Sequence, residues 1–184
     1  MSSPVAHGLA AYSLLITIEP RLTADPQTNR KTFLVSVLFG SMADADFLVA
    51  HFTKNPVLQH HFFSHSIFFG IGVFFLCFLI LKLLKQQNAW NAATLLGAAY
   101  NTHLVLDYFT EDRSHPFGIP LFWPFTNKHY LAPVEIFHSI HRGTVQSIFS
   151  IWNLTAILQE VFILMPVALL AFLRARKAAR ASWP

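Results

Sequence analysis

The sequence predicts an all-α fold, a polytopic membrane helical bundle of about five apolar helices with a long irregular loop between the last two. Apolar residues make up 54% of the 184 residues and charged residues only 12%, whereas soluble domains average about 25% charged residues. A mean hydropathy of +0.46 and apolar runs of helical length point the same way. We therefore expect an integral membrane protein surrounded by the lipid bilayer.

Five apolar segments account for the predicted helices. The first ends at Glu19 and is short for a full crossing of the bilayer. The third carries one charge, Lys82, is the strongest spanning candidate, and has Ser64 as its expected N-cap. In the last segment, Glu160 is expected to hydrogen-bond within the bundle. In chain order the segments cover residues 4–18, 32–50, 67–84, 90–109 and 147–173.

The connections between these segments differ in length and charge. Residues 21–31 read as a polar loop in which Asp25 and Pro26 favour a break. Residues 111–142 form the one long polar stretch, for which we expect irregular structure folded over one end of the bundle. Residues 1–173 are thus predicted as one membrane-embedded domain, followed by a basic cytoplasmic tail at 174–184.

The basic residues predict the orientation of the bundle, because cytoplasmic loops carry an excess of Lys and Arg. Five crossings with the first helix beginning outside place nine basic residues inside and four outside. This clustering favours membrane topology over nucleic-acid binding, so no nucleic acid is expected as a partner. The inner group is Arg21, Arg30, Lys31, Lys82, Lys85, Arg174, Arg176, Lys177 and Arg180, and the outer group is Lys54, Arg113, Lys128 and Arg142.

Histidine and aspartate residues gather at the outer end of this predicted bundle. His103 and Asp107 lie four residues apart on one helix face. There they could bind one metal ion, or the carboxylate could fix the imidazole tautomer and simply pin a helix end. Asp44 and Asp46 would point about 200° apart on a helix, so either the helix ends there or only one is a ligand. The full set is His7, Asp44, Asp46, His60, His65, His103 and Asp107.

Imidazole and carboxylate ligands without a thiolate suit Zn above all, with Mn, Fe or Ni as alternatives. His7 and Asp46 are predicted as catalytic residues that complete the ligand shell or accept a proton. Metal ions activate water, so we expect hydrolysis of a phosphoester or other ester in a small or lipid-like substrate. The predicted ligands of one or two divalent ions are His60, His65, His103, Asp107 and Asp44.

Several short motifs follow one another in a fixed order along the chain: Asp44-x-Asp46, His60-x4-His65-Ser66, His103-x3-Asp107-x2-Thr110, Gly118, and Leu121-Phe122-Trp123-Pro124-Phe125. This order resembles the inner-membrane, metal-dependent hydrolase family typified by YdjM, over most of the chain. The resemblance implies a hydrolase embedded in a bacterial-type inner (cytoplasmic) membrane. The chain differs in having His61 where that family usually has Arg, and Ala43 where it often has Pro.

A weaker likeness exists to zinc-dependent phospholipase C and P1-type nucleases, which are helical and bind several Zn ions. The order of His7, Asp44, His60 or His65, and His103-x3-Asp107 agrees with theirs, but the final His-x3-Glu of their pattern is missing. Two other classes stay open. A metal or proton transporter needs polar groups at the bilayer midplane, and a structural membrane protein would use its histidines only to satisfy one another.

Overall fold

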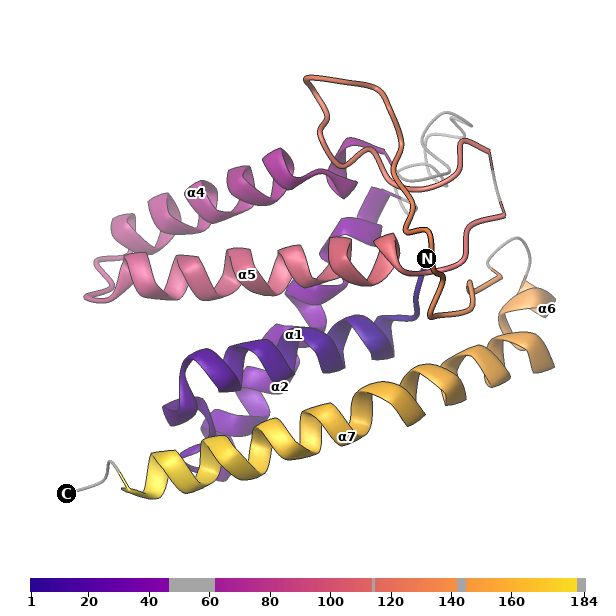
Figure 1. The fold of residues 1–184 in the computed structure, drawn as a ribbon. Helices are drawn as coiled ribbons and strands as arrows, with labels where there is room; N and C mark the ends of the chain where they lie inside the picture. The colour runs from indigo at the N-terminus through magenta and orange to yellow at the C-terminus, as the bar shows by residue number, and fades with distance from the viewer. Residues whose placement is uncertain (47–61, 114, 142–144, 182–184) are drawn as a thin grey trace.

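The computed structural model describes residues 1–46, 62–113, 115–141 and 145–181, and every regular element within them is a helix (Figure 1). The all-α prediction is therefore confirmed. The α-helices are α1 (Pro4–Ile18), α2 (Pro26–Gly40), α4 (Ile67–Leu83), α5 (Ala89–Tyr108), α6 (Val145–Ile148) and α7 (Ile151–Ala181). Three 3-10 turns join them: η1 (Pro20–Thr23), η2 (Met42–Asp44) and η4 (Phe63–His65).

Helix α1 is the centre of the bundle and packs against α2, α5 and α7, while α4 packs against α5. Figure 1 shows the long loop after α5 lying at the same end of the bundle as the N-terminus, with the C-terminal end of α7 at the other end. Small residues permit the close contacts. A Cβ on Gly97 of α5 would lie 2.9 Å from the Cβ of Phe74 in α4, so this approach requires glycine there.

One helix start and one N-cap differ from the sequence prediction. Helix α2 begins at Pro26, inside the predicted polar loop, because Asp25 accepts hydrogen bonds from the backbone amides of Gln27 and Thr28. An Asp N-cap followed by Pro at the first helical position is a strong start signal. The N-cap of α4 is Ser66 and not Ser64, since the Ser66 hydroxyl accepts from the amide of Phe69 at 3.1 Å.

The C-terminal helix is longer than predicted, because α7 continues through the basic residues to Ala181. Its N-terminal half is tied to the start of α1. Glu160 accepts a hydrogen bond from the Ser3 amide at 2.8 Å and another from the Ser3 hydroxyl. The prediction that Glu160 hydrogen-bonds within the bundle is therefore confirmed.

The exterior of the bundle is strongly apolar. On α4 only Gly70 and Val73 are buried, and exposed apolar side chains include Phe75 at 57% and Leu83 at 72%. An apolar surface of this extent marks contact with another apolar phase. Among the described residues, one helix, α7, is long and apolar enough to cross a membrane, and α1 and α4 are shorter apolar helices.

Between α5 and α6 the described residues are irregular, as predicted. Two isolated bridges organise them, Thr110 with Phe137 and Ile119 with Tyr130. The segment is anchored to α7 through Asn153, whose side chain accepts from the amide of His141 and donates to its carbonyl, both at 2.8 Å. The loop is thus held against the end of the bundle where α5 ends.

Candidate metal centre

Four of the predicted site residues meet at the end of the bundle where α2 and α5 end and α4 begins. Asp44 comes from η2, just after α2, and His65 from η4, just before α4. His103 and Asp107 come from the last two turns of α5. One potential ligand atom from each of the four lies within 4.8 Å of all the others. Segments far apart along the chain therefore contribute to one cluster.

Five of the six distances among the four donor atoms are close to the edge lengths of one tetrahedron. The Nε2 atoms of His65 and His103 are 3.1 Å apart, and they lie 3.4 and 3.1 Å from Oδ2 of Asp107. Oδ1 of Asp44 lies 3.8 Å from His65 and 3.7 Å from His103. Ligands bound at about 2.0–2.1 Å in tetrahedral geometry are separated by roughly 3.3 Å. The cluster therefore has the size that one divalent ion requires.

The imidazole of His65 is oriented by a carboxylate next to Nδ1, the ring nitrogen that does not face the cluster. Its Nδ1 lies 3.1 Å from Oδ2 of Asp46, and this carboxylate oxygen also accepts from the Ser64 hydroxyl at 2.8 Å and the Phe62 amide at 3.1 Å. The Tyr100 hydroxyl donates to the Ser64 carbonyl at 2.5 Å and fixes the same turn. A carboxylate on the outer nitrogen of a metal-binding His sets the tautomer that leaves Nε2 for the metal.

His103 is oriented in the same way by the backbone. Its Nδ1 lies 2.7 Å from the carbonyl oxygen of Gly40, which can only accept, so Nδ1 carries the proton and Nε2 faces the cluster. The last residue of α2 thus fixes a side chain of α5. This partner comes from the backbone, which explains why sequence patterns gave no sign of it.

Asp107 and His7 complete the buried part of the site. Both are at most 2% exposed. Oδ1 of Asp107 accepts from the Ser2 amide at 3.0 Å and lies 3.6 Å from Nε2 of His7. The His7 ring stacks on His103 with centroids 3.7 Å apart and planes 11° apart. His7 therefore contacts two members of the cluster from the side of α1.

The carboxylates make this end of the bundle favourable for positive charge. Burial lowers the pKa of His65, but hydrogen bonds with Asp107, Asp44 and Asp46 raise it more, so this pKa lies well above its ordinary value. Burial raises the pKa of Asp46, but the neighbouring His65 and Ser64 lower it more, and the net shift is downward. A site that attracts a proton in this way also attracts a divalent cation, which replaces the proton on binding.

The structure thus brings together Asp44, His65, His103 and Asp107 as potential ligands, and places Asp46 behind His65 and His7 beside His103 and Asp107. The predicted ligand His60 lies outside the described residues. Sequence reasoning missed Ser64, Tyr100 and Ser2 as supporting residues. Tyr100 lies three residues before His103 on α5, and this helical spacing was the available signal.

A buried cluster of potential metal ligands at one end of an apolar helical bundle defines a class of membrane protein with a candidate metal site. Comparison with known protein families agrees with this class and identifies the family. The chain belongs to the YdjM inner membrane protein family, which it matches over residues 1–180. It is accordingly an inner-membrane protein, associated with the lipid bilayer. No curated protein and no solved structure showed significant similarity to it.

Proposed function

We propose that this protein is a membrane-bound, metal-dependent hydrolase whose site lies at the non-cytoplasmic face of the inner membrane. The observation that carries the proposal is the near-tetrahedral group of four donor atoms, with both of its imidazoles oriented from behind. A hydrogen bond between the two Nε2 atoms would satisfy a purely structural pair, whereas here carboxylate oxygens of Asp44 and Asp107 also lie within 3.8 Å of both.

Two imidazoles and two carboxylates suit Zn, and Mn, Fe or Ni are the alternatives. The four residues suffice for one ion, and a second ion would need further ligands, for which His60 and His7 are the candidates. A bound ion of this kind makes water a nucleophile near neutral pH.

The solvent exposure of the four side chains suggests which of them hold the ion and which faces the substrate. The side chains of His65, His103 and Asp107 are fully buried, whereas that of Asp44 is 12% exposed. Substrate and water therefore reach the cluster from the side of Asp44. Four protein ligands would fill a tetrahedral ion, whereas a catalytic ion keeps one position open for water. We therefore assign the ion to the buried His65, His103 and Asp107, and assign to Asp44, beside the open position, the proton released by the attacking water. Asp46 keeps His65 in position, and His7 keeps Asp107 and His103 in position.

The setting suggests the substrate class. With five helices crossing the membrane and the basic ends of the helices in the cytoplasm, the cluster lies at the outer membrane surface. A lipid-like molecule with a phosphoester or other ester near its headgroup reaches such a site by diffusing within the bilayer. The long loop, anchored to α7, covers the same end of the bundle.

Metal content is the first test. Purified wild-type protein should bind about one Zn ion per chain, and His103→Ala and Asp107→Ala should lower the affinity at least 100-fold, because each removes a ligand. His138→Ala, an exposed histidine of the loop, serves as the matched control and should bind normally. Wild-type protein that retains less than one ion per chain after Zn loading would exclude the proposal.

Activity is the second test. Vesicles containing a panel of lipid phosphoesters and carboxyl esters are incubated with Zn-loaded protein, chelator-treated protein and His103→Ala, and product release is measured. We expect release by the Zn-loaded wild type only. Hydrolysis that survives both chelation and the substitution would show that the cluster is not the catalytic site. Uptake of Zn into sealed vesicles without hydrolysis would favour a transporter.

A further inference from the structure

A second feature, which the proposed hydrolase site does not use, lies along one face of α7 and extends from the start of α1 to the C-terminal end of α7. Helices α2 and α7 both pack on α1 and leave an apolar groove of about 620 Å³ between them. This volume falls within the range of about 300–1,000 Å³ that is usual for ligand pockets. The floor and walls include Leu9, Tyr12, Phe33, Val37, Leu169 and Phe172.

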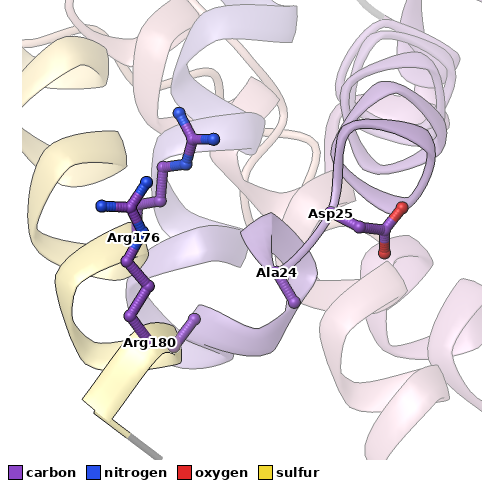
Figure 2. A pocket seen from close by; sticks show the side chains of 5 residues that line it. Ala24, Asp25, Arg176 and Arg180 are labelled. Atoms are coloured by element: carbon purple, nitrogen blue, oxygen red, sulfur yellow. The ribbon is translucent and has the colours of Figure 1, made fainter. Parts of the chain in front are cut away.

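A basic cavity of about 380 Å³ lies beside the C-terminal end of α7 and is lined by Arg176, Arg180, Ala24, Ala179 and Asp25. In Figure 2 the two arginine side chains extend from one side of α7, as expected for residues four apart on a helix.

Among the described residues, the carboxylate of Asp25 is the one acidic group that lines this cavity, and it already has hydrogen-bond partners. It accepts hydrogen bonds from the amides of Gln27 and Thr28 at 2.9 and 3.0 Å, at the positive end of α2. Figure 2 shows it pointing away from the two arginines. The cavity therefore offers its guanidinium groups to an anion from elsewhere.

The groove and the cavity follow one another along α7. Phe172 lines the groove, and one turn later the guanidinium of Arg176 lies 5.7 Å from the centroid of the Phe172 ring. Met165, Leu169, Phe172, Arg176 and Arg180 recur at helical spacing, so apolar and basic residues form one stripe. The stripe changes from apolar to basic toward the C-terminal end of α7, the end that the proposed orientation places in the cytoplasm.

We propose that this stripe binds one anionic phospholipid of the cytoplasmic leaflet, with its phosphate on Arg176 and Arg180 and an acyl chain in the groove between α2 and α7. Arginine binds phosphate with two parallel hydrogen bonds. A free phosphate would leave the adjoining apolar groove unfilled, and an uncharged lipid would leave the arginines without a partner. The lipid occupies a site separate from the metal cluster and is not the substrate.

The headgroup is tested with the intact protein in detergent, mixed with equal amounts of phosphatidylglycerol and phosphatidylethanolamine. Native mass spectrometry counts the retained lipids. The wild type should retain phosphatidylglycerol preferentially, and Arg176→Gln/Arg180→Gln should reduce this retention on the order of tenfold. The matched control, Arg174→Gln/Lys177→Gln, removes the same charge from the same helix turns outside the cavity and should behave as wild type. Equal retention of the two lipids, or equal loss in the two double variants, would overturn the proposal.

The acyl chain is tested by filling the groove. Leu169→Trp should lower phosphatidylglycerol retention, whereas Leu170→Trp, an exposed neighbour that does not line the groove, should not. Retention unaffected by Leu169→Trp, with displacement of the bound ligand by millimolar glycerol phosphate, would show a free-anion site instead and reject the lipid. Each variant is first shown to keep the helical circular dichroism and the thermal unfolding midpoint of the wild type, so that misfolding cannot produce the result.

Discussion

At the scale of single residues, the candidate centre depends on how its two imidazoles are held. Asp46 accepts from Ser64 and Phe62 with the same oxygen that faces Nδ1 of His65. It is therefore built into the turn before α4 and does not face the four donor atoms. We expect its effect on the metal to be indirect, through the orientation and basicity of His65.

Asp46→Asn tests this positioning role. The substitution keeps the size of the side chain but removes the charge that holds the His65 tautomer, so we expect Zn affinity to fall about 10–100-fold. A competition titration against a chelator measures it. Asp112→Asn is the control, because Asp112 also accepts from a backbone amide, that of Gly118, and is not one of the residues of the cluster. Asp46→Asn with wild-type affinity would show that His65 needs no carboxylate behind it.

At the scale of the helices, the site depends on the contact between α1 and α2. A Cβ on Gly40 would lie 2.6 Å from the carbonyl oxygen of His7 and 3.1 Å from the Cβ of Ala11. The same glycine supplies the carbonyl that accepts from His103. One backbone position therefore determines both how closely two helices approach and how one imidazole is oriented.

Gly40→Ala should push α1 away from α2 and, at the same time, lower the affinity of the site for Zn. Overpacking of this kind destabilises a protein by about 1–3 kcal/mol, and we expect both a lower midpoint of thermal unfolding and weaker Zn binding. Gly72→Ala in α4 is the matched control, since nothing lies within 4 Å of a Cβ built there and alanine favours a helix. If Gly40→Ala matched Gly72→Ala in both measurements, the helix contact would not control the site.

At the scale of the whole molecule, local sequence signals predicted the positions of most helices. They predicted the metal cluster only in part. The start of α4 at Ile67 and the end of α5 near Tyr108 lie within a residue or two of their predicted places, because apolar runs end sharply there. The start of α2 was wrong because the Asp25-Pro26 cap was read as a break and not as a helix start.

The convergence of Asp44, His65, His103 and Asp107 could be expected from topology, since alternating helices return to the same membrane face. Their division into facing and supporting residues could not, because it depends on side-chain direction in the 3-10 turns η2 and η4. Partners such as the Gly40 carbonyl and the Ser2 amide are backbone groups. Sequence patterns carry no information about which backbone group a distant side chain will reach.

The orientation of the bundle in the membrane decides which compartment the metal cluster faces, and it is predicted from the basic residues alone. Five crossings with the basic helix ends inside place the loop after α5 outside, and the α4–α5 turn and the end of α7 in the cytoplasm. Single cysteines introduced into a Cys77→Ser background report this directly. Lys128→Cys in the loop, Gln86→Cys after α4 and Lys177→Cys in α7 all replace exposed residues.

A membrane-impermeant maleimide added to spheroplasts should label Lys128→Cys at once, and should label Gln86→Cys and Lys177→Cys only after the membrane is permeabilised. Because Gln86 and Lys128 lie on either side of α5, opposite labelling also shows that this helix crosses the bilayer. Labelling of both from the same side would mean that α5 does not cross. If Gln86→Cys and Lys177→Cys were labelled at once and Lys128→Cys only after permeabilisation, the cluster would face the cytoplasm. Its substrate would then have to come from the inner leaflet.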